Sequence, residues 1–450
     1  MNNFDNVRIN TLCEALSENS KFDPKLYDKF DVKRGLRNKD STGVVAGLTN
    51  ICNVHGYVIN EGEIEPIPGE LYYRGYNIRD LVLNVEKDDR FGFEEVAFLL
   101  LTGKLPSEDG LKKFTEYIAE RRALPKDFVI DMIMKAPSKN IMNKLGRSVL
   151  ALYSYDDECE NSSLENEMRI ACDLIAKLPV IMTHAYQAKK SYYDHRSMIM
   201  HPLEKNQTIA ETILSLMRLD RKFTKEEAQL LDTMLMLHAE HGGGNNSAFT
   251  CRVLTSSGTD AYSAYASAIG ALKGPKHGGA NIKVMEMLEN FKTNVKNWED
   301  EGQVADHMRK ILRKEANDGS GLIYGMGHAV YTLSDPRAII LKKKAFSLAE
   351  GKDIEAEFKL LDTIERLTPE MFREVKGGEK VVCANVDMYS GLVYKMLNIP
   401  EELYTPLFAV SRIVGWSAHR MEEKLAGGRI IRPAYKAVAK PRSYKSLSDR

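Results

Sequence analysis

Hydrophobic residues recur at helical spacing along most of the chain. From Ile78 onward, apolar positions three and four residues apart form segments of roughly ten to twenty residues. Short breaks rich in glycine and proline separate these segments, as at 103–106 and at 274–275. Strands do not alternate with helices, which counts against a doubly wound nucleotide-binding fold, and no solenoid repeat is visible. The pattern predicts an all-α, mainly helical protein.

A different pattern precedes these helices. Between residues 43 and 76, β-branched and aromatic residues are punctuated by glycine and proline, which predicts one or two small β-hairpins. The residues before them are polar and charged, with helical fragments at 10–17 and 25–30. Near the other end, 400–425 has the composition of a long apolar helix, and the basic residues after it predict an arm.

One predicted helix ends in two histidines. Thr224 and Glu227 form a capping box that starts it, and its apolar periodicity ends at the glycines 242–244. His238 and His241 are three residues apart, so we expect them to share a face of this helix.

A second helical pattern, at about 260–272, breaks at a Gly-Pro pair just before His277. Histidines at helix ends, beside glycines that allow close approach of the backbone, are typical of a small-molecule site.

Composition and charge narrow the class of protein. Basic and acidic residues both number 63, so the formal net charge is zero and we expect no nucleic-acid partner. The six scattered cysteines contain no C-x-x-C pair, which argues for reduced thiols and against a zinc module. The N-terminus lacks the order of a signal peptide, and no apolar run is long enough to span a bilayer. We therefore expect a cytoplasmic protein without a membrane partner.

Two histidines, His277 and His328, lie next to glycines. His277 lies in GPKHGGAN, where a neutral imidazole can donate a hydrogen bond to an oxygen that gains negative charge. His328 follows Gly325 and Gly327 and precedes Arg337, which lies at an Asp-Pro-Arg helix start. A histidine and an arginine so placed could together bind a carbonyl compound that carries a carboxylate. For both histidines the alternative is a turn residue without a function.

Asp387 interrupts a largely apolar run from 381 to 397. Apolar surroundings disfavour the charged carboxylate and make it a stronger base, although an aspartate that caps a helix is the simpler interpretation. Arg337, Arg412 and Arg432 could bind anionic groups of a substrate. Together, these residues offer a base, hydrogen-bond donors and anion-binding groups.

The sequence His238-Ala-Glu-His241 is not the H-E-x-x-H of zinc proteases, because the spacing and the place of the glutamate both differ. A metal site also needs a third ligand, which the local spacing does not supply. We predict no metal ion here; either histidine could bind substrate or be satisfied by ordinary hydrogen bonds.

The chain from about Gly43 to Pro433 resembles citrate synthase in six motifs, which occur in this order: GELYYRGYNIRDL, GPKHGGAN, GHAVYTLSDPR, NVDMYSG, FAVSRIVGW and GRIIRP. The resemblance implies a mainly helical homodimer with a minor β-hairpin near the N-terminus. It also implies a large domain of residues 1–280 and 388–450, and a small domain of residues 281–387 that closes over the substrates.

The resemblance implies a role for each matching residue. Asp387 would take a proton from the methyl group of acetyl-CoA, and His277 would stabilise the resulting enol or enolate at the thioester oxygen. His328 would polarise the keto group of oxaloacetate and protonate the developing alkoxide. Citryl-CoA would then be hydrolysed to citrate and CoA.

Four residues would bind the oxaloacetate carboxylates: His241, Arg337, Arg412 and Arg432. Of these, Arg432 would reach in from the partner subunit. Gly325 and Gly327 would let the backbone approach CoA. The resemblance implies acetyl-CoA as a co-substrate, with no metal and no permanently bound cofactor.

Three alternatives stay open at this point. A 2-methylcitrate synthase would use propionyl-CoA, and its acyl site would differ by one methyl group, for which discrimination is modest. A non-catalytic helical binding protein could share the scaffold, although it would not need to keep Asp387, His277 and His328 together. A metal-dependent hydrolase using His238 and His241 is the third.

Overall fold

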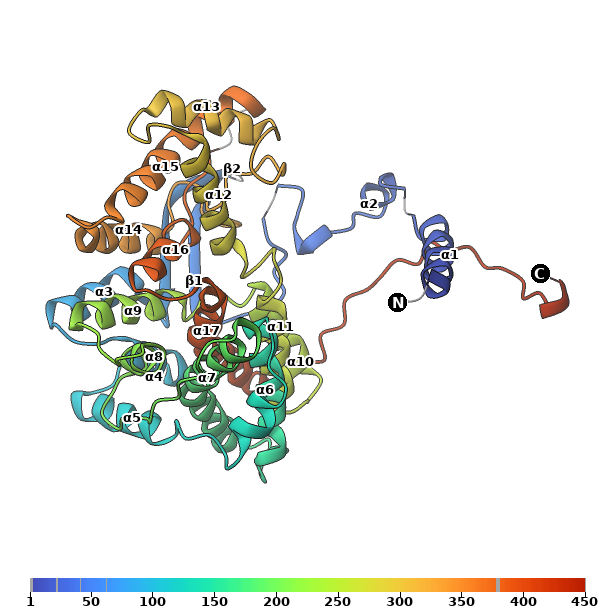
Figure 1. Cartoon of the computed structure of the whole chain (residues 1–450). Helices are drawn as coiled ribbons and strands as arrows, with labels where there is room; N and C mark the ends of the chain where they lie inside the picture. The colour runs from blue at the N-terminus through green and yellow to red at the C-terminus, as the bar shows by residue number, and fades with distance from the viewer. Residues whose placement is uncertain (1–2, 22, 41, 62, 378–380, 450) are drawn as a thin grey trace. The chain divides into compact units, whose positions relative to one another are not determined.

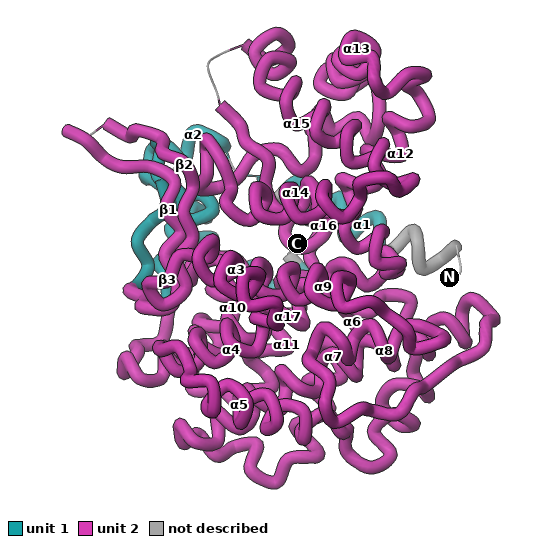
Figure 2. The backbone as a smooth tube through the Cα atoms, turned by 90° about the vertical axis from the view of Figure 1, so that its left-hand side faces the viewer, with its two compact units in different colours: residues 1–47, 432–450 teal, residues 48–431 magenta. Residues whose placement is uncertain are grey.

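The computed structural model describes residues 3–21, 23–40, 42–61, 63–377 and 381–449. The chain forms two compact units, a terminal unit of residues 1–47 and 432–450 and a main unit of residues 48–431 (Figure 2). The terminal unit contains α1 (Asn3–Asn19), α2 (Lys25–Lys29), η1 (Arg34–Leu36) and η5 (Leu447–Asp449). The two helical fragments predicted near the N-terminus are therefore confirmed.

The main unit begins with a small antiparallel sheet. It consists of β1 (Cys52–Asn60), β2 (Glu63–Tyr73) and β3 (Tyr76–Asn77), in that order. The β1–β2 register shifts between His55 and Tyr57, which leaves Gly56 in a bulge. This sheet confirms the predicted hairpin region.

The remainder of the main unit is helical, as predicted (Figure 1). The helices of its first half are α3 (Ile78–Lys87), α4 (Phe93–Thr102), α5 (Glu108–Glu120), η2 (Val129–Met134), α6 (Ile141–Leu152), η3 (Tyr153–Tyr155), α7 (Leu164–Asp194), α8 (Ile209–Met217) and α9 (Lys225–His238). Those of its second half are α10 (Asn246–Ser256), α11 (Ala261–Leu272), α12 (Ala280–Asn294), α13 (Glu301–Leu312), α14 (Pro336–Ala349), α15 (Glu355–Lys376), α16 (Asp387–Met396), η4 (Glu401–Leu403) and α17 (Tyr404–Leu425).

Short polar side chains determine where many of these helices begin. The predicted capping box is present, because Thr224 and Glu227 each accept from the other's backbone N–H at the start of α9. Asp260 caps α11, and Asp335 caps α14 ahead of a proline in the first turn. These caps confirm three helix starts expected from the sequence.

The end of α9 differs from the prediction. The helix stops at His238, so His241 does not share a helix face with it and lies instead in the irregular segment that follows. The side chain of Glu240 accepts the backbone N–H of Gly242 at 2.5 Å, and Gly242 has a φ of 87°, which L side chains rarely adopt. The helix therefore ends before the glycine run, and the turn that follows lies within the run, where the Asn245 N–H donates to Gly242 O at 3.1 Å.

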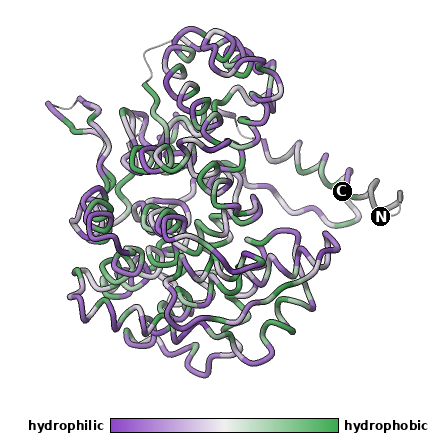
Figure 3. The backbone as a smooth tube through the Cα atoms, turned by 60° about the vertical axis from the view of Figure 1, so that its left-hand side comes forward, coloured by the Kyte–Doolittle hydropathy of each residue, from purple (hydrophilic) through white to green (hydrophobic). Residues whose placement is uncertain are grey.

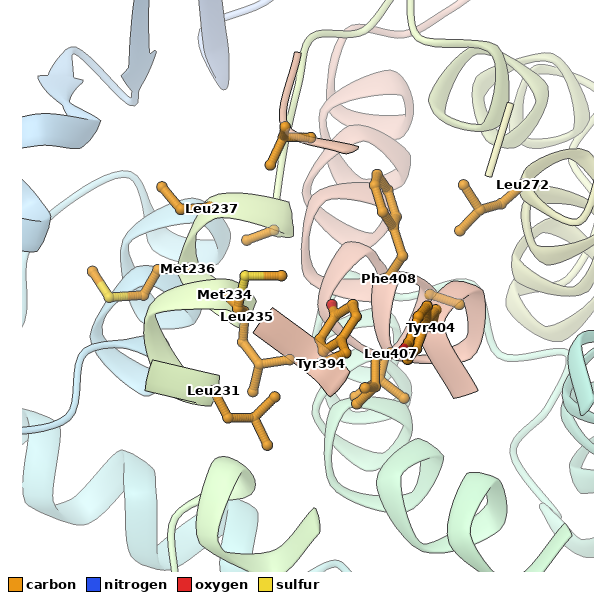
Figure 4. Packing of buried hydrophobic residues seen from close by; sticks show 14 of the residues in the cluster. Leu231, Met234, Leu235, Met236, Leu237, Leu272, Tyr394, Tyr404, Leu407 and Phe408 are labelled. Carbon is orange, nitrogen blue, oxygen red and sulfur yellow. The ribbon is translucent and has the colours of Figure 1, made fainter. Parts of the chain in front are cut away.

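Helix α17 is the central helix of the main unit. All of its residues from Tyr404 to Met421 are buried, and it packs against α7, α9, α10 and α11 (Figure 1). Figure 4 shows side chains of α9, including Leu235, beside Tyr394 of α16 and Leu407 of α17. This confirms the long apolar helix predicted near the C-terminus.

The outer helices are amphipathic, so hydrophobic and hydrophilic residues alternate around each helix (Figure 3). Helix α3, for example, buries Ile78, Leu81, Val82 and Val85 and exposes Leu83. Within the described part of the chain, no helix combines the length and apolarity needed to cross a membrane.

Candidate active site

Helix α17 places Arg412 and Arg420 in the interior, and Arg412 has the fewer hydrogen-bond partners of the two. Its Nε donates to the carbonyl oxygen of His238 at 2.6 Å, at the end of α9. The side chain is fully buried, and Nη1 and Nη2 have no hydrogen-bond partner among the described residues. Burial lowers the pKa of Arg412, but a guanidinium still stays protonated. A buried cation with two unused donor groups is suited to binding an anion.

Arg337 is the second buried arginine near this point. Its Nε and Nη2 donate to the two carboxylate oxygens of Asp335 at 3.1 and 2.7 Å. Burial opposes the charged guanidinium, but Asp335 raises the pKa of Arg337 above its ordinary value. Because Asp335 also caps α14, the helix start fixes the plane of the guanidinium.

His241 and His328 face each other although 87 positions separate them, from 241 to 328. Their ring centroids lie 4.9 Å apart with the ring planes nearly perpendicular. Burial is the main reason that the pKa of His241 falls well below its usual value, and the charge of Arg337 adds to the effect. His241 is therefore a neutral imidazole at physiological pH.

Hydrogen bonds determine the tautomer of His328. Its Nδ1 accepts the backbone N–H groups of Val330 and Tyr331 at 3.1 and 3.0 Å. A backbone N–H can only donate, so Nδ1 carries no proton and the neutral ring carries its proton on Nε2. His328 therefore presents a hydrogen-bond donor at Nε2.

His277 lies between α11 and α12, and Ser247 contacts its ring. The distance from His277 Nε2 to Ser247 Oγ is 3.1 Å, and the same oxygen accepts from Trp416 Nε1 at 3.1 Å. Burial, with a smaller effect from Arg412, lowers the pKa of His277 to about 4. The imidazole is therefore neutral at pH 7 and can donate a hydrogen bond without carrying a charge.

Asp387 is the first residue of α16, so it is not the helix cap that the alternative interpretation required. Its backbone N–H donates to Asn385 Oδ1 at 3.0 Å. Burial raises the pKa of Asp387 to about 6, although the charges of Arg337 and Arg412 act in the opposite direction. A carboxyl group with this pKa is a better match for a proton-abstracting base than an ordinary aspartate.

Hydrogen bonds pair the loop before His328 with the segment before Asp387. Gly327 N–H donates to Cys383 O at 2.7 Å, and Asn385 N–H donates to Gly325 O at 2.9 Å. Asn385 Nδ2 also donates to Gly327 O at 2.9 Å. Gly325 and Gly327 both have positive φ, at 82° and 95°. This pairing brings the loop of His328 next to the start of α16.

The structure therefore brings together six of the predicted residues, which we call the active-site cluster: His241, His277, His328, Arg337, Arg412 and Asp387. The charge of Arg412 influences the pKa of His241, His277 and Asp387, so all of them lie within electrostatic range of one guanidinium. Arg432 is exposed and belongs to the terminal unit, so its role stays a prediction.

Several supporting residues were not found from the sequence. The neighbour of His241, Glu240, accepts from His419 Nε2 at 2.9 Å, and His419 Nδ1 accepts from Arg252 Nη2 at 2.7 Å. Arg252 in turn donates to Glu423 Oε2 at 2.8 Å and also pairs with Glu422. This hydrogen-bonded chain, fully buried at Glu240 and His419, holds the segment that carries His241. The signal in the sequence was that His419, like Arg412, interrupts the mainly apolar segment 400–425.

In the portion of the chain that the structure describes, no group of three His, Cys, Asp or Glu side chains is placed to hold a metal ion. His238 is fully buried with its ring 4.4 Å from that of Phe408, and neither ring nitrogen has a partner among the described residues. Burial lowers its pKa well below the usual value, so the ring is neutral.

Comparison with known proteins gives the context for this cluster. Residues 40–434 match the family model described as citrate synthase, C-terminal domain. A citrate synthase of Corynebacterium glutamicum is 34% identical over 397 residues, which cover 84% of each chain. A 2-methylcitrate synthase of Shewanella oneidensis is 32% identical over 384 residues, or 84% of this chain and 92% of that protein.

Solved structures agree. The ternary complex of carboxymethyl coenzyme A and oxaloacetate with citrate synthase from Thermoplasma acidophilum aligns with a TM-score of 0.74 at 27% identity. The alignment covers 93% of this chain and 99% of that one. A citrate synthase from Thermotoga maritima aligns with a TM-score of 0.73 at 27% identity, over 93% of this chain and 99% of that one. This chain therefore belongs to the citrate synthase family.

Proposed function

We propose that this chain, an acyltransferase of the citrate synthase family, condenses acetyl-CoA with oxaloacetate and water to give citrate and CoA. The observation that carries this proposal is Arg412, a fully buried guanidinium with two nitrogens that have no partner among the described residues. Arg337 lies close enough to lower its pKa, so two cations share one region. A dicarboxylate would balance both charges and complete their hydrogen bonds.

Oxaloacetate would be bound by three members of the cluster. Arg337 and Arg412 would each take a carboxylate, and the neutral His241 would donate to one of them. The Asp335 pair supports this role for Arg337, because a guanidinium with a fixed plane loses little entropy when it binds. His328 would donate its Nε2–H to the keto oxygen and polarise the carbonyl carbon.

The reaction would then proceed in three steps. Asp387 would remove a proton from the methyl carbon of acetyl-CoA while His277 stabilises the enol or enolate at the thioester oxygen. That carbon would attack the keto carbon of oxaloacetate, and the new alkoxide would take the Nε2 proton of His328. Water would finally attack the thioester of citryl-CoA and give up a proton to the deprotonated His328. The carbon–sulfur bond would break as the proton held by Asp387 passes to sulfur, which releases CoA as a thiol and restores both residues.

Closure of one domain over the substrates is part of the proposal. His328 and Arg337 come from residues 281–387, the proposed small domain, and His241 and Arg412 come from the proposed large domain of residues 1–280 and 388–450. Binding a substrate between them would draw the two parts together and exclude water. Gly325 and Gly327 would line the CoA side. Solution scattering that is unchanged by oxaloacetate and a CoA analogue would contradict this closure.

A 2-methylcitrate synthase is the second candidate, and its support is the 32% identity to the Shewanella oneidensis enzyme. The experiment that tests the function is a thiol-release assay with oxaloacetate and either acetyl-CoA or propionyl-CoA. We expect release from both and a higher kcat/KM with acetyl-CoA, since one methyl group changes affinity by only about 1–3 kcal/mol. A preference for propionyl-CoA would select the second candidate. No release from either, in folded protein, would favour a non-catalytic binding protein.

The raised pKa of Asp387 predicts how activity depends on pH. A base must be unprotonated, so activity is present above the pKa of about 6 and is lost as the pH falls through it. We expect kcat/KM for acetyl-CoA to fall about tenfold per pH unit below this point. His277, whose pKa is about 4, stays neutral throughout this window.

The control for this profile is Asp387→Asn, which should lower kcat at least about a hundredfold at every pH while oxaloacetate still binds. Activity of the unaltered protein that persists unchanged down to pH 4 would show that Asp387 is not the base.

We further propose a cytoplasmic homodimer in which Arg432 completes the oxaloacetate site of the partner. The free state of the cysteines in the described residues suits a reducing compartment. Hybrid dimers test the arginine. Mixing Arg432→Ala and Asp387→Asn subunits should restore part of the activity, because one of the two sites then has both residues intact. The exposed Arg429→Ala variant is a matched control that should stay active by itself. If the mixture shows no rescue, Arg432 does not act across the interface.

A further inference from the structure

Tyr331 lies against both histidines that face each other in the active-site cluster. Its ring is stacked on that of His328, with centroids 4.6 Å apart and an interplanar angle of 23°. It also contacts the His241 ring edge-on, at 5.6 Å between centroids. Its backbone N–H is one of the two donors to His328 Nδ1. Tyr331 therefore covers one face of the His328 imidazole, supplies one of the two donors that set its tautomer, and also contacts His241.

The hairpin holds Tyr331 in turn. Its hydroxyl donates to the carbonyl oxygen of Glu70 in β2 at 3.1 Å, and the side chain is only 2% exposed. Burial raises the pKa of Tyr331, so the hydroxyl stays protonated and continues to donate. Three residues further along the same loop, Ser334 accepts the backbone N–H of Gly69 at both O and Oγ, at 3.1 Å each.

Two glycines on neighbouring strands make room for this loop. A Cβ at Gly69 would lie 2.1 Å from Ser334 O and 2.6 Å from Tyr331 Cδ1. A Cβ at Gly56, in the β1 bulge, would lie 2.8 Å from Val330 O and 3.1 Å from Tyr331 Cδ1. At each glycine, the nearest of these contacts is closer than real Cβ atoms ordinarily allow. The hairpin backbone therefore serves as the surface on which the Tyr331 ring lies.

We propose that Tyr331 is a positioning residue for His328, and that the β1–β2 hairpin is the template that holds it. The ring of Tyr331 fixes the orientation of the imidazole, and its backbone N–H, together with that of Val330, fixes the Nε2–H tautomer. The hydroxyl of Tyr331 binds Glu70 and so holds the residue against the hairpin. Tyr331 does not touch the reacting atoms. The inference rests on the proposed function, because His328 must be the group that polarises and protonates the keto oxygen.

Three variants test the proposal in the full-length protein. Tyr331→Phe removes the bond to Glu70 but keeps the ring, so kcat should fall only severalfold, about the effect of one lost neutral hydrogen bond. Tyr331→Leu removes the stacked ring and should lower kcat about a hundredfold, as a shift of about 1 Å at a reacting group does. Gly69→Ala, which changes no catalytic side chain, should act like Tyr331→Leu because it displaces the loop.

The control is Gly47→Ala, an exposed glycine with no atom within 4 Å of the added Cβ, which should keep full activity. If Tyr331 only fills space, Tyr331→Leu will lower the midpoint of thermal unfolding while kcat, measured well below that midpoint, stays the same. Equal kcat in the Phe, Leu and unaltered proteins would overturn the proposal.

A second readout does not depend on catalysis. In protein labelled with ¹⁵N-histidine, the His328 signals, assigned by their loss in His328→Gln, should show the Nε2–H tautomer. Tyr331→Leu keeps the backbone N–H but removes the ring and hydroxyl that hold the loop, and Gly69→Ala displaces the loop directly. In both variants the two backbone donors should move away from Nδ1 and the signals should become a mixture of tautomers, whereas Gly47→Ala should leave them unchanged. Unchanged signals in both variants would contradict the positioning role. If the unaltered protein releases no CoA but these signals shift, the proposed function fails and the positioning of His328 stands.

Discussion

A buried positive charge is the constraint on which the centre of this protein depends. Arg412 lies in the mainly apolar first part of α17, and only its Nε has a hydrogen-bond partner among the described residues. Removing a guanidinium from water without a full set of partners costs several kcal/mol, on the order of what a whole domain gains from folding. The surrounding helices must therefore be stable enough to hold an arginine in a state that only a bound anion would complete.

The other buried arginines show how different Arg412 is. Arg420, two turns further along α17, donates to both carboxylate oxygens of Glu167 at 2.7 Å. Arg337 has the carboxylate of Asp335, and Arg252 has two glutamates and a histidine. Each of these pairs joins elements that are distant in the sequence or fixes a helix start. The pairs of Arg420 and Arg252 organise the fold, and the Asp335 pair orients Arg337 beside the site. Arg412 has no such carboxylate partner and is the arginine that a ligand would complete.

His241 and His277 are uncharged for the same reason, their burial near Arg412. Burial lowers the pKa of His241 and His277, and the nearby guanidinium charge adds to the effect. The cluster therefore keeps its positive charge on arginines, which bind carboxylates, and leaves imidazoles as uncharged donors for carbonyl oxygens. The same burial raises the pKa of Asp387, so one low-dielectric environment prepares the base and the donors together.

Local patterns in the sequence were sufficient for the helices, the hairpin, the capping box at Thr224 and the helix starts near Asp260 and Asp335. The motifs also supplied the side chains of the active-site cluster. What local patterns did not supply was contact between distant residues. Ser247 beneath His277, and Glu240 bonded to His419, depend on how α9, α10 and α17 cross.

Two details show the limit most clearly. The placement of His241 within a helix was wrong, because α9 ends at His238 and the Gly242 backbone N–H donates to the Glu240 side chain instead of continuing the helix. Helical periodicity in the sequence does not reveal such a bond. Gly56 and Gly69 look like ordinary turn or bulge residues in the sequence, and only the packed loop around Tyr331 shows why a Cβ is excluded at both.

The measurement that tests the role of Arg412 most directly is thermal unfolding of the unaltered protein and Arg412→Met, each with and without oxaloacetate. We expect oxaloacetate to raise the unfolding midpoint of the unaltered protein, because a ligand that binds only the folded state stabilises it. Without ligand, Arg412→Met should unfold at the same or a higher temperature, since a buried charge has been removed, and it should not respond to oxaloacetate. A lower midpoint in the variant without ligand, together with an undiminished response to oxaloacetate, would show that Arg412 is a structural residue and would contradict the account.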